Sequence, residues 1–387
     1  MVKEIKVIVG SNYGDEGKGL MTDYFAHKAT SEGKRVLNIL TNGGPQRGHT
    51  VTTSSGKHHV FHHFGSGTFA GTATYCNRTF IVNPLEFQRE AQELQSKVNK
   101  LPKVIINPLC RFTTPYDMIV NRICEETRGD DRHGSCGMGI WETVQRYTKR
   151  QYGCNHSIGD MLRLDRDDRK AVIILIRTMM QMQLVRYGLD EIPSQWKDIW
   201  DSEILIENYL AALEYMEMTC EIAKPNFDMY DTIIYENGQG LLLSESEDNV
   251  HTTPSVTGLL AAVDHIYWEG YGAVDVEVCY VSRTYLTRHG AGDLPGECSK
   301  EVLGITDDDE TNIPNPYQGT LRYAPLKIQE LAHRVNNDFW HSPSSYWKCS
   351  LAFTHMNEVN VDYSAIRHHY HKVYGSYGKC RELVKEE

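Results

Sequence analysis

The chain has 387 residues, of which 40% are hydrophobic and 24% are charged, and its formal net charge is −11 at pH 7. This composition is typical of a folded globular protein and excludes a disordered chain or a fibre. The negative charge argues against nucleic acid as a partner, and the lack of an apolar run of about 18 residues argues against a membrane. Ten cysteines without a Cys-x-x-Cys pair, and a start without a signal segment, predict a reduced, cytoplasmic protein.

The first elements along the chain predict an α/β fold. The β-branched run 6–9 is a strand that ends in a glycine-rich loop at 10–19, and a helix is predicted over 20–29. The mostly apolar segment 36–40 is a second strand, and it also leads into a glycine loop. This order is typical of a parallel sheet covered by helices.

Later segments extend the same pattern. Further strands are predicted at 104–106, 232–235, 274–281 and 351–354, and helices at 84–96, 169–187, 203–223, 257–266 and 324–337. No internal repeat or low-complexity linker divides the chain. We therefore expect a single domain over 1–387, with a large, mostly parallel central sheet flanked by helices and a helical subdomain inserted at about 155–225.

The first glycine loop, 10–19, has the composition of a phosphate cradle. Glycines at a strand-to-helix junction let backbone N–H groups face an anion, and the helix N-terminus and Lys18 add positive charge. The loop departs from a standard P-loop because Gly19 stands where a magnesium-binding Ser or Thr is expected. Asp15 is unfavourable beside an anion unless it binds magnesium or moves a proton. A tight turn without a ligand is the alternative interpretation.

The second glycine loop, 43–50, follows the strand at 36–40. Loops at the carboxyl ends of parallel strands converge on one edge of the sheet, where such folds bind ligands. His49 in this loop is a candidate general acid. A purely structural histidine is the alternative, and the presence of two converging glycine loops disfavours it.

Several motifs together resemble the adenylosuccinate synthetase family. Segment 14–19 matches its Gly-Asp-Glu-Gly-Lys-Gly motif. Its Gly-Gly-His-Asn-Ala-Gly-His-Thr loop is matched at Gly43, Gly44, Gly48, His49 and Thr50, whereas Pro45, Gln46 and Arg47 depart from it. Three further family motifs, Gly-Thr-Thr-Gly-Arg-Gly-Ile, Glu-Gly-Ala-Gln-Gly and Thr-Arg-Val-Gly-Ala-Gly, are similar to segments 134–140, 236–240 and 287–292. The resemblance implies a P-loop-like architecture related to GTPases.

The resemblance also implies the reaction and its residues: a nucleoside triphosphate and Mg²⁺ drive ligation of L-aspartate to a purine nucleoside monophosphate. Asp15 takes the purine N1 proton, the 6-oxygen attacks the γ-phosphate, and aspartate's amine displaces the phosphate, while His49 and Gln239 stabilise charge. The implied nucleotide- and phosphate-binding residues are Ser11, Asn12, Gly14, Glu16, Gly17, Lys18, Gly19, Gln46, Gly48, Thr50, Ser135, Cys136, Arg150, Thr253, Asn357 and Gly378. The implied aspartate site comprises Asn315, Gly319, Thr320 and Arg322, and the implied metal ligands are Asp15 and Gly48. A homodimer is implied in which Arg150 reaches the neighbouring subunit's nucleotide.

Three departures from the family pattern bear on the substrates. The sequence Thr354-His355-Met356-Asn357 stands where the family has a guanine-reading Thr-Lys-x-Asp motif. An asparagine both donates and accepts, which suits adenine, so we expect ATP as the phosphate donor. Arg322 stays in register to bind a carboxylate, whereas Thr320 replaces an arginine that in the family also contacts the ribose 2′-hydroxyl. The chain after Asn357 is short, as in archaeal and phage members.

These departures resemble the diaminopurine branch of the family, which ligates aspartate to dGMP and gives 2-amino-2′-deoxy-N6-succinyladenylate, ADP and phosphate. Asp15 argues against that branch, in which a small residue often replaces this aspartate. An enzyme that acts on IMP with GTP or ATP is therefore the main alternative. A non-catalytic nucleotide-binding protein is a second, weaker one.

The remaining patterns are interpreted structurally. Strand alternation splits a group of histidines between two faces and disfavours a zinc site at His58, His59, His62 and His63. A solvated strand edge is predicted at His368, His369 and His371. A packing face, or a dimer interface, is predicted at Leu175, Met179, Met180, Met182 and Val185.

Overall fold

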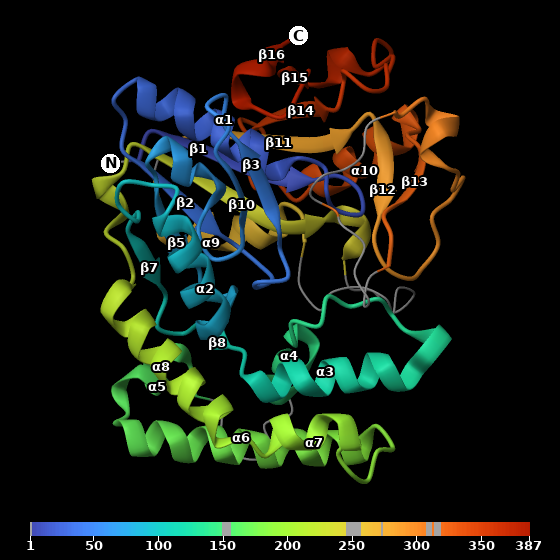
Figure 1. Ribbon diagram of the computed structural model, residues 1–387. Coiled ribbons are helices and arrows are strands. Elements are labelled where there is room, and N and C mark those ends of the chain that lie inside the picture. Colours follow the sequence, from blue (N-terminus) through green and yellow to red (C-terminus); the bar gives the residue numbers. More distant parts are fainter. Residues whose placement is uncertain (1, 149–155, 245–256, 272–273, 307–311, 313–318) are drawn as a thin grey trace.

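The computed structural model describes residues 2–148, 156–244, 257–271, 274–306, 312 and 319–387 (Figure 1). Within these residues the centre is a ten-stranded sheet of order β16-β15-β14-β11-β1-β10-β2-β5-β7-β9. Its neighbouring strands run parallel except for the antiparallel pair β15 and β16. The predicted α/β fold with a large, mostly parallel sheet is therefore confirmed.

The strands fall into the central sheet and three small pairs. The central sheet contains β1 Glu4–Gly10, β2 Val36–Leu40, β5 Ala73–Cys76, β7 Val104–Ile106, β9 Glu221–Ile222, β10 Thr232–Gly240, β11 Asp275–Arg283, β14 Lys348–Thr354, β15 Val373–Ser376 and β16 Val384–Glu386. The pairs are β3 His49–Thr52 with β4 His58–Phe61, β6 Ile81–Val82 with β8 Arg111–Phe112, and β12 Tyr285–Arg288 with β13 Arg322–Pro325.

The described α-helices are α1 Lys18–Ser31, α2 Pro84–Gln95, α3 Pro115–Arg128, α4 Ile140–Thr148, α5 Ile158–Arg163, α6 Arg166–Arg186, α7 Ser194–Trp200, α8 Glu203–Thr219, α9 Leu260–Glu269 and α10 Ile328–Phe339. Local sequence explains several of their starts. Thr114 and Asp117 form a reciprocal capping box before α3. Asn83 caps α2, with Pro84 in the first helical position, where its missing N–H costs nothing.

The helices lie on both faces of the sheet and at one end of it (Figure 1). One face carries α1, with Leu20 and Phe25 packed in a cluster with Ile8 of β1. The other carries α9 and α10, whose Ile266 and Leu331 join a second cluster. Helices α5 to α8 form a layer beyond β7 and share one apolar cluster with residues of β2, β5 and β7. Because this cluster is continuous, we propose that they are an insertion in a single domain.

Several segments differ from the prediction. The helix expected over 203–223 ends at Thr219, because 221–222 pairs with β7 as an edge strand. The helix expected from 324 begins at Ile328, because the residues before it pair with β12. Helices α3 and α4 were not predicted. The histidines at 368–369 lie in a short 3₁₀ turn, 367–369, rather than on a strand edge.

The predicted methionine face is also divided by the structure. Met179 and Met180 are buried in the core beside Ile176, whereas Leu175, Met182 and Val185 remain about half exposed. Met179 is four residues from Leu175 and three from Met182, so it lies at the boundary between the side of α6 that faces the core and the side that remains exposed. Within the described part of the chain, no helix combines the length and apolarity needed to cross a membrane.

Candidate active site

The first glycine loop, between β1 and α1, encloses an internal carboxylate. The backbone N–H groups of Asn12 and Gly14 donate to Glu16 Oε1 at 3.0 and 2.9 Å, and Lys18 Nζ lies 2.6 Å from Glu16 Oε2. Glu16 and Lys18 are buried. The loop amides thus converge on negative charge, as a phosphate cradle requires, but in the free protein that charge belongs to Glu16.

Two close backbone approaches tie this loop to its neighbours. A Cβ atom on Gly240 would lie 2.1 Å from the Asn12 carbonyl oxygen, and one on Gly19 would lie 2.8 Å from the Thr50 carbonyl oxygen. Only glycine fits at such distances, so both positions are sterically required. The end of β10 and the second glycine loop therefore both touch the first loop, and the predicted convergence of the two loops is confirmed.

Asp15 is one of two non-glycine residues in the described part of the chain with a positive φ, at 56°. Its Oδ2 lies 3.2 Å from Nε2 of His289, and Arg283 Nε donates to its carbonyl oxygen at 2.5 Å. Burial alone would raise the pKa of the Asp15 carboxyl, but the bond to His289 and the charges of Arg283 and Lys18 lower it below its usual value. Asp15 is therefore ionised, as both a proton acceptor and a magnesium ligand must be.

His49 is held by a buried charge network. Its Nδ1 lies against the carboxylate of Glu236, which also contacts the Arg47 guanidinium and the Ser66 hydroxyl. Burial raises the pKa of Glu236, but Arg47 and His49 outweigh it and lower that pKa to about 2. Burial lowers the pKa of His49, and Arg47 lowers it further, to about 3, against the opposing effect of Glu236. The His49 ring is therefore neutral in the free protein.

Two glutamines lie beside this network. The Gln46 amide folds over the loop backbone, where a Cβ atom on Gly43 would lie 2.4 Å from Gln46 Nε2. Both polar atoms of the Gln46 amide are buried without a hydrogen-bond partner among the described residues. Gln239, near the end of β10, donates from Nε2 to the Leu243 carbonyl at 3.3 Å. A buried amide without partners is a ready contact for a polar ligand.

Segment 134–140, which resembles a phosphate-binding motif of the family and is called the third loop below, also holds an internal carboxylate. The N–H groups of Gly134 and Ser135 donate to Glu125 Oε2 at 2.8 and 3.2 Å, and Ser135 Oγ donates to Asn121 at 2.9 Å. A Cβ atom on Gly134 would lie 2.5 Å from Gly290 Cα. This loop therefore touches segment 287–292, the same segment that brings His289 to Asp15.

Arg322, the predicted aspartate-binding residue, is already paired. Its Nε donates to Glu297 Oε1 at 2.9 Å and its Nη2 bonds the second carboxylate oxygen, which makes the pair bidentate. Its Nη1 donates to the carbonyl oxygens of Gly290 and Gly292 at 3.0 and 2.8 Å. A substrate carboxylate that binds the Nε and Nη2 edge of this guanidinium in a bidentate way would take the place that Glu297 now holds.

The predicted donor-base site lies at the ends of β14 and β15. Asn357 is exposed, and the preceding Met356 N–H donates to the Ser376 carbonyl at 3.0 Å. Ser376 Oγ in turn donates to the Gly378 carbonyl at 2.8 Å. Asn357 and Gly378 therefore belong to one strand-end cluster.

The other predicted residues are more scattered. Gly48, Gly319 and Thr320 are exposed. Burial raises the pKa of the Cys136 thiol to about 11, so it is protonated at neutral pH. Arg150, Thr253 and Asn315 lie outside the described residues.

Several residues that sequence reasoning missed complete the site. Arg334 of α10 donates to the Ser11 carbonyl and to Asn12 Oδ1, at 3.0 and 2.6 Å, and so holds the backbone of the first loop in place. The sequence could have drawn attention to His289 and Arg47, since each departs from the family motif around it. Nothing in the local sequence marks Glu297, whose partner Arg322 is 25 residues away.

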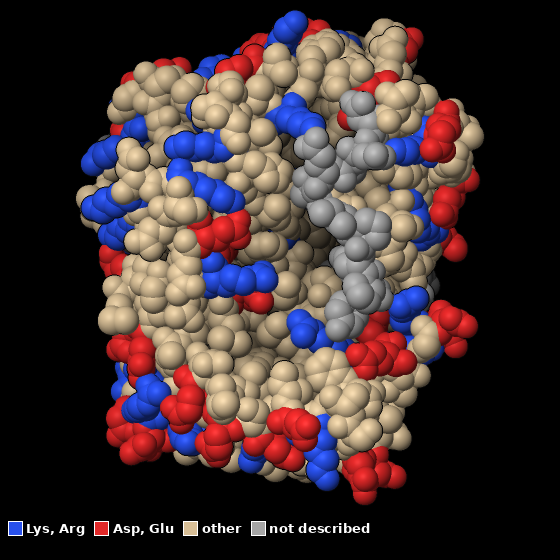
Figure 2. All heavy atoms as spheres, in the orientation of Figure 1, with Lys and Arg blue, Asp and Glu red and all other residues tan. Residues whose placement is uncertain are grey.

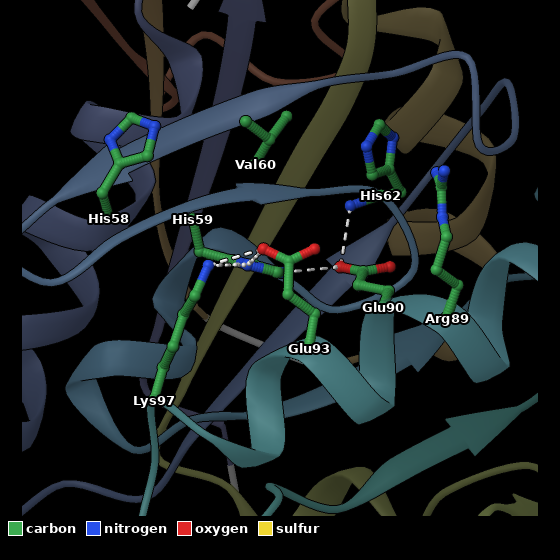
Figure 3. Close-up of a pocket in the computed structure, with 8 residues that line it drawn as sticks. All are labelled: His58, His59, Val60, His62, Arg89, Glu90, Glu93 and Lys97. Atoms are coloured by element: carbon green, nitrogen blue, oxygen red, sulfur yellow. Dashed lines mark hydrogen bonds and ion pairs between the residues drawn. The ribbon is translucent and has the colours of Figure 1, made fainter.

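The histidine-rich strand β4 lines a separate cavity of about 130 Å³ (Figure 3). Its lining residues are His58, His59, Val60, His62, Arg89, Glu90, Glu93 and Lys97. Their charges are matched internally, as in the pairs Lys97–Glu93 at 2.6 Å and His59–Glu93 at 3.3 Å. In the part of the chain that the structure describes, no three His, Cys, Asp or Glu residues are placed to hold a metal.

His62 links this cavity to the active-site loop. Its Nδ1 bonds the carbonyl oxygens of Pro45, at 2.8 Å, and Arg47, while its backbone N–H donates to Glu90 at 2.9 Å. The residue therefore supports the second glycine loop rather than a metal.

Figure 2 shows a hollow in this face of the molecule, with Lys and Arg side chains near its margin. This parallel sheet with anion-facing loops defines a nucleotide-binding α/β protein. The family model described as adenylosuccinate synthetase matches residues 7–312, so the chain belongs to the adenylosuccinate synthetase family. It is a ligase that forms a C–N bond between aspartate and a purine nucleotide.

Individual relatives agree with this assignment. Adenylosuccinate synthetases of Limosilactobacillus reuteri and Lactobacillus acidophilus are 27% and 26% identical to the chain, over 83% of it and 70% of each relative. The fully ligated adenylosuccinate synthetase of Plasmodium falciparum has a similar fold, with a TM-score of 0.66 and 16% identity over 92% of this chain and 77% of that one. The cyanophage S-2L succinoaminodeoxyadenylate synthetase, PurZ, bound to dGMP and dATP as an energy donor, has a TM-score of 0.66 and 15% identity over 100% of this chain and 95% of that one.

Proposed function

We propose that the chain ligates L-aspartate to C6 of dGMP, with ATP as the phosphate donor, to give 2-amino-2′-deoxy-N6-succinyladenylate, ADP and phosphate. The main support is Thr320, which is exposed beside Arg322 where the family has an arginine that contacts the ribose 2′-hydroxyl. Loss of that contact removes a reason to prefer a ribonucleotide. The likeness to a dGMP-bound enzyme, which spans nearly all of both chains, also supports the proposal.

In the proposed reaction, Asp15 accepts the proton of purine N1. Loss of that proton raises the electron density on the 6-oxygen, which attacks the γ-phosphate to form a 6-phosphoryl intermediate. His49 and Gln239 contact the groups on which charge develops, and Lys18 with the first-loop amides holds phosphate oxygens. The amine of aspartate then attacks C6, phosphate leaves with the C6–O bond pair, and the amine loses one proton.

We propose Mg²⁺ as the cofactor, held by the Asp15 carboxylate and the Gly48 carbonyl. The ionised Asp15 suits a hard cation, and magnesium usually takes one or two protein ligands together with substrate phosphates rather than a complete protein cage. When bound, the ion neutralises charge on the transferring phosphate.

We also propose a homodimer in which Arg150 completes the neighbouring subunit's site. The half-exposed Leu175, Met182 and Val185 on α6 offer an apolar surface for such contact. Mixing inactive Arg150→Ala chains with inactive Asp15→Asn chains should restore partial activity, because some mixed dimers hold one intact site. Absence of rescue, with subunit exchange verified by mass spectrometry, would mean that Arg150 does not act in trans.

IMP is the competing substrate, and the presence of Asp15 together with the named relatives favours it. Equimolar IMP and dGMP, supplied with aspartate and ATP, distinguish the two when products are identified by mass spectrometry. The proposal expects the succinylated deoxyguanylate product to predominate. Accumulation of the succinylated IMP product alone would identify an ordinary adenylosuccinate synthetase and refute our interpretation of Thr320.

A further inference from the structure

Three glutamate carboxylates of this chain lie where backbone amides or a guanidinium could bind an anionic ligand. The exposed fractions of these three side chains differ sharply. Glu16 lies at the first-loop amides and Glu125 at the third-loop amides, with side chains only 1% and 2% exposed. Glu297 lies on the Arg322 guanidinium, and its side chain is 43% exposed. Separating a buried carboxylate from its partners costs much free energy, because little water is present to replace them. An exposed carboxylate is hydrated as it leaves, so its separation costs less.

The local backbone explains why a carboxylate is drawn to Arg322. In the antiparallel pair of β12 and β13, Arg288 lies directly opposite Arg322, and like charges in that arrangement repel. The Arg288 guanidinium stacks over the Tyr13 ring at 4.7 Å, which places this pair of arginines beside the first loop. The Cys298 N–H donates to the Tyr323 carbonyl at 2.9 Å and so holds the preceding residue, Glu297, next to Arg322.

We propose that Glu297 is an internal stand-in for the substrate carboxylate, which occupies Arg322 in the free enzyme and is displaced when L-aspartate binds. The inference rests on the proposed role of Arg322 in aspartate binding. Glu297 offers the same planar carboxylate and the same bidentate geometry that a substrate carboxylate would use. Its release exposes one carboxylate to water and leaves the Nε and Nη2 edge of Arg322 to the substrate.

Displacement should be modest in energy because the pair is partly solvated. The Arg322 side chain is 24% exposed, so water and salt already weaken its attraction to Glu297. The internal pair therefore lowers the apparent affinity for aspartate without blocking it. It also selects for a ligand with enough negative charge to compete.

The test is the variant Glu297→Gln, which keeps the side-chain length and removes the charge. We expect the KM for L-aspartate to fall about 2- to 5-fold, with the KM for ATP unchanged, since exposed ion pairs contribute modestly. The matched control is Glu330→Gln on α10, an exposed glutamate paired with Lys327 at 2.9 Å and remote from Arg322 in the hydrogen-bond network. It removes the same net charge and should leave the aspartate KM unchanged.

The Arg322→Leu background separates this inference from the proposed function. There the aspartate KM should rise, and adding Glu297→Gln should no longer lower it. If Arg322→Leu leaves the aspartate KM unchanged, the role of Arg322 is wrong and the stand-in is wrong with it. If Arg322→Leu raises the KM but Glu297→Gln alone leaves it unchanged or raises it, Glu297 instead orients Arg322, and only the stand-in is refuted.

Discussion

The carboxylates in the strand-end region around His49 and beside the antiparallel pair of β12 and β13 around Arg322 differ sharply in their burial and in their partners. Glu236 is completely buried and shared among His49, Arg47 and Ser66. Glu297 is nearly half exposed, and among the described residues its carboxylate pairs with Arg322. The first arrangement is fixed by the central sheet, and the second sits on a two-stranded pair at its margin.

The difference agrees with the roles that we propose for the two regions, phosphate transfer around His49 and aspartate binding at Arg322. Groups around the transferring phosphate need little reorganisation at the moment of reaction, which favours a buried and pre-paired network. The amino-acid substrate must enter and leave in each cycle, which favours an exposed pair that is easily broken. The following predictions test this comparison, beginning with the largest expected effect.

The variant Asp15→Asn removes the carboxylate that we propose accepts the N1 proton, and it keeps the side-chain shape. We expect kcat to fall about 10²- to 10⁴-fold, the usual contribution of a general base. Circular dichroism and initial-rate measurements on the purified variant check the expectation. Asp362→Asn, a change at an exposed carboxylate that accepts a hydrogen bond from the Ser364 N–H, is the control. Near-normal turnover by Asp15→Asn would show that another group takes the proton.

The comparison itself is tested by removing each carboxylate in turn. Glu236→Ala leaves the buried Arg47 without its counter-charge, so the free energy of unfolding should fall by about 3–5 kcal/mol. Glu297→Ala breaks a partly solvated pair and should cost less than about 1 kcal/mol. Urea unfolding of both variants measures the difference. Equal losses would contradict the proposed contrast between the two regions.

A smaller effect is expected at the exposed end of β14. Asn357→Asp should shift the ratio of kcat/KM values from ATP toward GTP by several-fold, because a carboxylate accepts from guanine but not from adenine N1, and one hydrogen bond contributes about 0.5–1.5 kcal/mol. Asn360→Asp, an exposed change three residues further on, controls for added charge. An unchanged ratio would remove Asn357 from donor recognition.

Short apolar strands were the most predictable part of the fold. The strands at 36–40 and 104–106 have the predicted bounds, because short runs of β-branched and aliphatic residues, interrupted only by Asn38, admit few other structures. Helix α3 was missed because its Thr114–Asp117 capping box precedes a run that mixes apolar and polar residues. The start of α10 was misplaced because pairing with β12 takes the residues before it, and that partner is about 35 residues away in the chain.

The candidate site also has one part that the sequence predicts and another that it does not. Glycine-rich motifs, with Asp15, Lys18 and His49 at their expected places, are readable from the sequence because short-range spacing shapes an anion-binding turn. The neutral state of His49 was not readable, since it depends on Arg47 and on Glu236, which lies 187 residues further along. The sequence by itself determined the family and the positions of the glycine-rich loops that contain the candidate catalytic residues. Only the tertiary structure decided which carboxylate faces which cation, because those pairings depend on long-range packing and burial rather than on spacing along the chain.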